Sequence, residues 1–215
     1  MHAHTLRARM RVMVLTDRAL ASPRSVSTVV AEALAGGVRS IQLRDKSGSA
    51  RDLYAQAKTL IALTRPAGAL LFVNDRVDVA VAAGADGVHL GPDDLSVEAA
   101  RAWTPTGFFI GYSTDDPVLA RSAATAGADY IGCGAVFGTT SNDVGGEAIG
   151  LDRLRAVVRA VPIPVIAIGG IGPHNAELVA SSGAAGIAVL SAVMATADPR
   201  AAAQRLVSSM GAPKR

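Results

Sequence analysis

The sequence predicts an α/β protein that folds as a single (β/α)₈ TIM barrel, on three observations. Eight short runs rich in β-branched residues recur along the 215 residues, and they are apolar on both faces, as strands of a buried parallel sheet are. Stretches with helical periodicity, such as 49–63 and 151–160, lie between these runs. One strand plus one helix takes about 25 residues, which suits a barrel at the small end of its size range.

The eight strands are expected, in chain order, at 11–17, 40–44, 70–75, 87–91, 108–113, 130–134, 164–170 and 186–191. Ser96 is expected to cap the helix after the fourth strand, because its hydroxyl satisfies free backbone N–H groups. Four segments share one plan, from a helix end through glycine into a strand: AGGVRSIQL, AGADGVHL, AGADYIGC and SGAAGIAVL. This repetition indicates that one supersecondary unit is reused. An open doubly wound sheet is the alternative fold, but its G-x-G-x-x-G fingerprint is missing after the first strand.

Composition indicates one globular domain over residues 1–215. Residues 1–9 are expected to form an N-terminal arm that need not be ordered. Half of the residues are hydrophobic and the net charge is only +3, with scattered basic residues, so small anionic substrates are favoured over nucleic acid. Cys133 is the single cysteine, and no run is long and apolar enough for a membrane span. We expect a cytoplasmic protein, and a homo-oligomer is compatible with this sequence.

Polar residues gather at the expected carboxyl ends of the strands, where barrels of this kind carry their active sites. Asp75 ends the third strand and Asp94 follows the fourth, so the two carboxylates should be neighbours around one mouth. Carboxylates beside basic and amide groups suit Mg²⁺ together with a diphosphate. The glycine-rich turns after strands seven and eight suit a phosphate. His89, in the middle of a strand, is expected to be a core residue with its hydrogen bonds satisfied.

Seven segments make this pattern specific: QLRDK, VNDRVDVA, GADGVHLGPDDL, GYS, GTTS, AIGGI and GIAVLS. In this order, over residues 10–208, they resemble the thiamine-phosphate synthase family. The resemblance implies a transferase that condenses 4-amino-2-methyl-5-(diphosphooxymethyl)pyrimidine with thiazole phosphate, giving thiamine phosphate and diphosphate, without a protein nucleophile. Carried over by motif, the pyrimidine diphosphate would contact Gln42, Arg44, Lys46, Asn74, Ser113 and Asn142. The thiazole phosphate would contact Thr139, Thr140, Ser141, Gly170, Leu190 and Ser191, and Mg²⁺ would be bound by Asp75 and Asp94.

Two alternatives stay open beside the transferase. A related barrel family, the thiazole tautomerases, shares much of the pattern but typically has a histidine after the sixth strand, where this chain has Ala135, and does not need both aspartates. A non-catalytic protein that binds thiamine precursors is the other alternative. It is motivated by Asn142, which stands where the synthase family has a lysine that meets the diphosphate.

Asn142→Lys is predicted to raise kcat with a smaller change in affinity for the diphosphate substrate. The leaving group gains charge only as the C–O bond breaks, so a cation there helps the transition state more than the ground state. A charge-assisted hydrogen bond of about 1.5–3 kcal/mol corresponds to a gain of roughly tenfold to a hundredfold. Pre-steady-state assays of diphosphate release provide the measurement. A variant that is no faster when chemistry limits turnover would show that another cation already fills the role.

Overall fold

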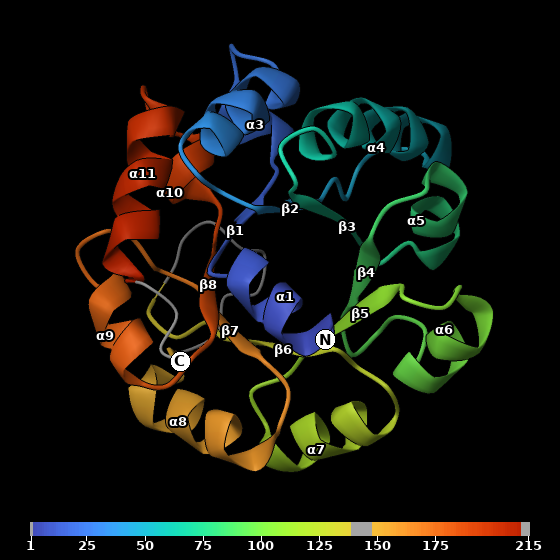
Figure 1. Ribbon diagram of the computed structural model, residues 1–215, viewed down its shortest axis with the longest axis vertical. Coiled ribbons are helices and arrows are strands. Elements are labelled where there is room, and N and C mark those ends of the chain that lie inside the picture. The colour runs from blue at the N-terminus through green and yellow to red at the C-terminus, as the bar shows by residue number, and fades with distance from the viewer. Residues whose placement is uncertain (1, 139–147, 212–215) are drawn as a thin grey trace.

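The computed structural model describes residues 2–138 and 148–211, and only the backbone of residues 2–5. Eight parallel strands pair in chain order and close into a barrel, β1-β2-β3-β4-β5-β6-β7-β8. Helices surround the strands on the outside, and α11 lies beside α3 where the ring of helices closes (Figure 1). The predicted (β/α)₈ barrel is therefore confirmed.

The strands are β1 (Val12–Leu15), β2 (Ser40–Leu43), β3 (Leu70–Asn74), β4 (Gly87–Leu90), β5 (Phe109–Ser113), β6 (Tyr130–Cys133), β7 (Val165–Ile168) and β8 (Gly186–Val189). The helices up to β6 are α1 (His2–Arg9), α2 (Arg18–Ala21), α3 (Val26–Ala35), α4 (Ala50–Thr64), α5 (Val77–Ala83), α6 (Val97–Trp103) and α7 (Pro117–Thr125). Those that follow are α8 (Gly150–Ala160), α9 (Ala176–Ser181), α10 (Ser191–Met194) and α11 (Pro199–Ser209). No helix in the described part of the chain is long and apolar enough to cross a membrane.

Each strand lies within its predicted range, and local chemistry sets where the helices begin. Ser96 caps α6 as predicted, because its hydroxyl accepts a hydrogen bond from the backbone N–H of Ala99 at 3.2 Å. Ser49 and Asp52 form a reciprocal capping box at the start of α4. The seventh strand ends two residues earlier than predicted. Gly169 and Gly170 have φ angles of 98° and 64°, which is left-handed backbone that ends the extended strand.

The two faces of the barrel wall differ in composition. Side chains alternate along each strand, so the pairing of Gln42 with Phe72 and of Asn74 with His89 places these four on one face. That face is the barrel interior, and it is rich in polar, aromatic and glycine residues. The opposite face carries mainly Val, Ile and Leu, such as Val14, Ile41 and Leu71, which are fully buried between the sheet and the helices. The main apolar core therefore lies outside the barrel wall.

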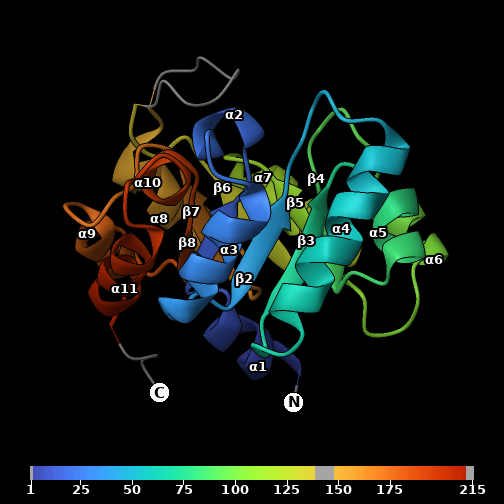
Figure 2. The ribbon, with the colours of Figure 1, turned by 90° about the horizontal axis from the view of Figure 1, so that it is seen from above.

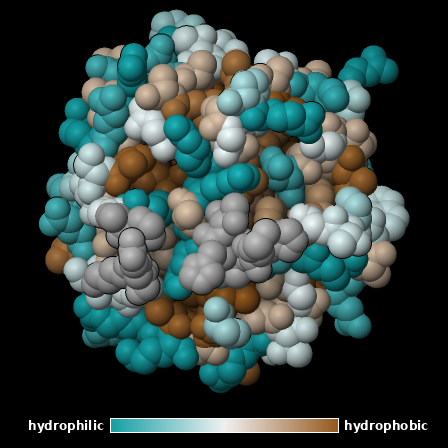
Figure 3. Space-filling view, in the orientation of Figure 1, coloured by the Kyte–Doolittle hydropathy of each residue, from teal (hydrophilic) through white to brown (hydrophobic). Residues whose placement is uncertain are grey.

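Helix α1 lies across the amino-terminal end of the barrel. Figure 2 shows it at the end opposite α2, and Figure 1 shows it in front of the strands. Leu6 and Met10 are 3% and 0% exposed, so this segment packs against the barrel. Residues 2–9, expected as an arm, thus form a helix in the structure. On this face the described hydrophobic residues form separate small areas between hydrophilic ones (Figure 3).

Gly186→Ala is predicted to destabilise the barrel where β8 closes against the segment entering β1. A Cβ at this position would lie 1.9 Å from the backbone oxygen of Met10, and backbone yields little. Overpacking of this kind costs about 1–3 kcal/mol or more in the free energy of unfolding, to be measured by denaturant unfolding. Gly138→Ala is the matched control, since a Cβ there meets nothing within 4 Å. Equal stability of the two variants would contradict close packing at the closure.

Candidate active site

The carboxyl ends of the strands form one rim, and the described site residues lie on it. Asn74 and Ser113 are the last residues of β3 and β5, and Gln42 lies inside β2. Arg44 and Lys46 follow β2, while Gly170, Leu190 and Ser191 follow β7 and β8. Thr139, Thr140, Ser141 and Asn142 lie outside the described residues. The structure therefore brings the predicted residues of strands two to five, seven and eight to one end of the barrel.

The backbone of the loop after β2 is held by Thr16, at the end of β1. The Thr16 hydroxyl accepts a hydrogen bond from the Arg44 N–H at 3.0 Å and donates one to the Arg44 carbonyl at 3.3 Å. Thr16 is only 1% exposed, and its own N–H donates to the Gln42 carbonyl at 2.9 Å. Gln42 and Arg44 are therefore fixed to β1 on either side of Leu43.

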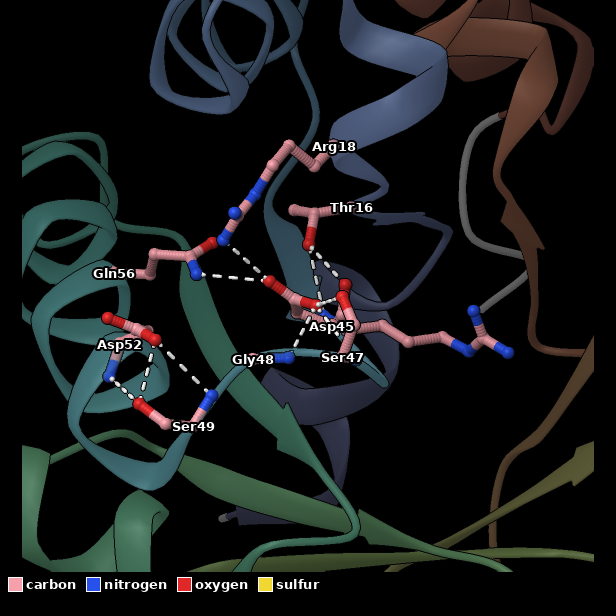
Figure 4. A network of polar contacts seen from close by, with 9 residues as sticks. Thr16, Arg18, Asp45, Ser47, Gly48, Ser49, Asp52 and Gln56 are labelled. Atoms are coloured by element: carbon pink, nitrogen blue, oxygen red, sulfur yellow. Dashed lines mark hydrogen bonds and ion pairs between the residues drawn. The ribbon is translucent and has the colours of Figure 1, made fainter.

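Asp45 ties the rest of this loop together (Figure 4). One carboxylate oxygen accepts hydrogen bonds from the Ser47 N–H, the Ser47 hydroxyl and the Gly48 N–H, each at 3.0–3.1 Å. The other accepts from Arg18 at 2.8 Å and from Gln56 at 3.3 Å. Burial acts to raise the pKa of Asp45, but the hydrogen bonds from Gln56 and Ser47 outweigh it and the pKa is lowered. The loop that carries Lys46 is thus anchored by an ionised carboxylate.

Asp75 has an unusual backbone. Its φ is 65°, and among the described residues it is the one non-glycine with a positive φ. Its N–H donates to the His89 carbonyl at 2.8 Å, which joins the loop after β3 to β4. The following helix, α5, begins after Arg76, which makes no side-chain capping bond. Aspartate tolerates left-handed backbone better than most residues, and such strain gathers at functional positions.

The carboxyl groups of Asp75 and Asp94 face each other at the mouth. Asp94 Oδ2 accepts a hydrogen bond from the Gly91 N–H at 2.7 Å, which leaves its second oxygen for other partners. Burial raises the pKa of Asp75 to about 6, and the hydrogen bond and charge of Asp94 add to the shift. The charges of Lys46 and Arg44 act in the opposite direction, so both cations are near this carboxyl group. A cation close to the two carboxyl groups would favour their ionised forms.

A chain of polar side chains lies below this pair in the barrel interior. His89 Nε2 is 2.8 Å from the Ser113 hydroxyl, and His89 Nδ1 is 2.9 Å from the Tyr130 hydroxyl. Burial lowers the pKa of His89 to about 4, and the charge of Asp94 only partly opposes this. Burial also raises the pKa of Tyr130, against a hydrogen bond with Gln42. His89 is therefore a satisfied and neutral core residue, as predicted.

On the other side of the mouth, a cavity of about 440 Å³ lies between the ends of β7 and β8. Gly170, Leu190 and Ser191 line it, together with His174 and Arg205. Asn175 holds the glycine-rich turn, because its side chain accepts from the Gly172 N–H and donates to the Gly170 carbonyl, both at 2.9 Å. The cavity is of a size and polarity that suit a phosphorylated small molecule.

Both ends of the segment that carries residues 139–147 are held at this rim. Val136 and Phe137 donate their N–H groups to the carbonyls of Ile168 and Gly169, at 2.8 and 3.1 Å. After the segment, the Ile149 N–H donates to the Ala135 carbonyl at 2.9 Å. The described residues on both sides of positions 139–147 are thus anchored at the rim, while residues 139–142, which carry the remaining predicted contacts, lie outside the described residues.

Several positioning residues were not predicted from the sequence. Thr16, Asp45 and Asn175 hold the loops of the mouth, and Tyr130 is the buried partner of His89. A signal was present for Asn175, which stands just before a helix in a glycine-rich turn where side chains often bond the backbone. The partners of Thr16 and Tyr130 lie 28 and 41 residues away in the chain, so local pattern carries no sign of them.

The chain is similar in sequence and in structure to known proteins. The family model described as thiamine monophosphate synthase matches residues 12–193. A thiamine-phosphate synthase of Natronomonas pharaonis is 47% identical over 93% of this chain and 94% of its own length. One from Pyrococcus furiosus is also 47% identical, over 94% of this chain and 95% of its own length. The solved structure of a thiamine phosphate pyrophosphorylase from Pyrococcus furiosus superposes with a TM-score of 0.87 at 45% identity, covering 95% of this chain and 97% of that chain.

The metal-free protein is predicted to titrate Asp75 near pH 6. Since the pKa of Asp75 is about 6 when folded and about 3.9 when unfolded, the folded chain binds this proton more tightly. The associated stability is present below about pH 4 and is lost as the pH rises through about 6. A carboxyl ¹³C titration by NMR measures this pKa, and Asp94→Asn should lower it. If Asp75 titrates near its usual value in both proteins, the two carboxyl groups do not interact.

Proposed function

Since the chain belongs to the thiamine monophosphate synthase family, we propose that the barrel mouth joins the pyrimidine diphosphate to the thiazole phosphate, with Mg²⁺ bound by Asp75 and Asp94. The chain is a transferase of thiamine biosynthesis, and relatives at 45–47% identity over most of its length are named for that activity. The assignment of substrates and metal to individual residues is the part that we propose here.

The facing pair of Asp75 and Asp94 is the observation that carries the proposal. The described residues hold no group of three or more His, Cys, Asp or Glu side chains that could bind a metal, so a site built wholly from protein ligands is not formed by them. Mg²⁺ does not need one, because it takes one or two carboxylates and completes its shell with water and phosphate oxygens. The raised pKa of Asp75 supports this fit, since a divalent cation would offset both the burial and the charge of Asp94 that raise it.

The residues of strands two to five suit the pyrimidine diphosphate. Arg44 and Lys46 act on the charge of Asp75 and would neutralise the diphosphate beside it. Gln42, Asn74 and Ser113 offer amide and hydroxyl groups around the barrel interior for the pyrimidine and its leaving group. Bound Mg²⁺ supplies further positive charge to the diphosphate. Because these groups are fixed before reaction, they stabilise the charge that develops as the C–O bond breaks.

The cavity between β7 and β8 suits the thiazole phosphate. Gly170, Leu190 and Ser191 line it, and we assign the phosphate to their backbone N–H groups. Thr139, Thr140, Ser141 and Asn142, which lie outside the described residues, are proposed to complete the contacts. With the diphosphate held on one side and the thiazole on the other, diphosphate departs to leave a cation that the aminopyrimidine stabilises, and the thiazole nitrogen then attacks its methylene carbon. No side chain has to act as a nucleophile in this reaction.

The alternatives receive less support. An isomerase acting on the thiazole would not require two facing aspartates, and the relatives of this chain are named as synthases. A non-catalytic binding protein would not require cations fixed beside a carboxylate pair. A cytoplasmic location and action on small phosphorylated molecules, not nucleic acid, stay part of the proposal. They are supported by the single buried Cys133 and by the scattered basic residues.

Asp75→Asn and Asp94→Asn are predicted to lower Mg²⁺-dependent diphosphate release by roughly a hundredfold or more, because each removes a ligand of the ion that stabilises the leaving group. Asparagine also tolerates the left-handed backbone of Asp75, so the melting temperature should stay nearly constant. Turnover with both substrates and calorimetric Mg²⁺ titration provide the measurements.

Asp93→Asn is the matched control, because Asp93 is adjacent to Asp94 but exposed. It makes the same change of charge and should keep activity near that of the parent chain. Full Mg²⁺-dependent turnover by Asp94→Asn would show that the metal assignment is wrong.

A further inference from the structure

Three side chains from neighbouring strands form a continuous hydrogen-bond chain in the barrel interior. Ser113 on β5, His89 on β4 and Tyr130 on β6 are joined by contacts of 2.8 Å (Ser113 Oγ to His89 Nε2) and 2.9 Å (His89 Nδ1 to Tyr130 OH). His89 and Tyr130 are 9% and 1% exposed, while Ser113 lies at the mouth and is partly exposed. The chain therefore runs from the buried interior to the position where the pyrimidine diphosphate is proposed to bind. We call it the interior chain.

Two glycines make room for the interior chain. Gly111 and Gly132 lie on the inner face of β5 and β6, where such barrels usually carry bulky branched residues. A Cβ on Gly111 would lie 2.1 Å from Tyr130 Cζ and 2.5 Å from His89 Nδ1. A Cβ on Gly132 would lie 2.9 Å from His89 Cε1 and 3.3 Å from His89 Nε2. Glycine within a strand weakens it, so these strands give up packing where the polar groups need space.

The stacked rings fix the orientation of the His89 imidazole but leave two possible hydrogen-bond directions along the interior chain. His89 and Tyr130 stack with centroids 5.4 Å apart and planes 26° apart, so the imidazole cannot rotate freely. Buried away from water, the imidazole is neutral and has one N–H donor and one acceptor nitrogen. Only two arrangements of hydrogens satisfy all three residues. In one, Ser113 donates to His89; in the other, His89 donates to Ser113.

Only one of these two arrangements suits a diphosphate. The oxygens of a diphosphate only accept hydrogen bonds, so Ser113 must donate its hydroxyl hydrogen to one of them. On the proposed function, in which Ser113 faces that diphosphate, we propose that Tyr130 and His89 are positioning residues that make Ser113 a fixed donor to the leaving group. Tyr130 donates to His89 Nδ1, His89 Nε2–H donates to the Ser113 oxygen, and the Ser113 hydrogen points outward.

This arrangement prepares the hydroxyl before the substrate arrives. An unconstrained serine hydroxyl rotates, and part of its hydrogen-bond energy is lost in ordering it at the moment of reaction. With its oxygen already accepting from His89, Ser113 has its hydrogen directed at the developing charge. Strand β4 also fixes Asp75, whose N–H donates to the carbonyl of the same His89. One histidine thus locates the serine by its ring and an aspartate by its backbone.

The tautomer of His89 is the direct test and needs no substitution. In protein labelled with ¹⁵N-histidine, long-range ¹H–¹⁵N correlation spectra distinguish a protonated from an unprotonated ring nitrogen at neutral pH. We expect Nε2 of His89 to be protonated and Nδ1 to be unprotonated. The chain has four histidines, and His89 is identified by contacts of its ring protons with Gly132. Protonation at Nδ1 would overturn the proposal.

A double-mutant cycle tests the effect on catalysis. Tyr130→Phe keeps the ring and removes the donor to His89, and we expect kcat to fall about tenfold with the KM for thiazole phosphate unchanged. In a Ser113→Ala background the same substitution should have no further effect on kcat, because the group that it positions is gone. Independent, additive losses would overturn the proposal, since they would indicate general damage to the barrel.

Further variants separate this proposal from a purely structural role and from the proposed function. His89→Gln retains an amide donor and should keep more of kcat than His89→Leu. Ser40→Ala removes another fully buried hydroxyl, at the start of β2, and should leave kcat unchanged. If Ser113→Ala has no effect on kcat, Ser113 does not contact the leaving group and the proposal fails, while the metal assignment is tested separately by Asp94→Asn.

Discussion

Closure of the parallel sheet between its first and last strands is the constraint on which the rest of the molecule depends. Val12, Met13 and Val14 of β1 pair with Ile187, Ala188 and Val189 of β8. A closed parallel barrel has no edge, so all eight strands direct their carboxyl ends to the same rim. Residues as distant in the sequence as Gln42 and Leu190 thereby come to one mouth. The site exists because the sheet closes, and no single loop contains it.

The acidic residues at the mouth differ in how their charges are matched. Asp45 lies in sequence between Arg44 and Lys46, where a carboxylate could cancel one of the cations. Its charge is instead matched by Arg18, and its oxygens are occupied by the backbone and side chains of its own loop. Asp75 and Asp94, in contrast, act on each other through a hydrogen bond and through their charges, with Lys46 and Arg44 near Asp75. Asp45 therefore stabilises its own loop, whereas Asp75 and Asp94 remain available to bind a ligand.

The sequence predicted all eight strands and the rim residues, because buried parallel strands leave apolar runs that end at polar residues. The same reasoning placed Asp75 beside Asp94, since consecutive strands are neighbours in such a barrel. It did not predict the left-handed backbone of Asp75 or the contact between His89 and Tyr130. These features depend on the distance between β4 and β6 and on the space left by Gly111. The distance between strands and the space beside a glycine are set by packing in the folded barrel. The periodicity and spacing of the sequence therefore do not predict them.

The aromatic ring of Tyr130 and the missing side chain of Gly111 occupy one shared volume. The three atoms nearest to a Cβ at position 111 are side-chain atoms of Tyr130 and His89. The two positions therefore constrain each other during evolution. A larger residue 111 requires that Tyr130 and His89 both give way, so enlarging residue 111 alone is expected to give a less stable barrel. Among relatives, the residues at positions 111 and 130 should accordingly change together or not at all, although they lie on two different strands.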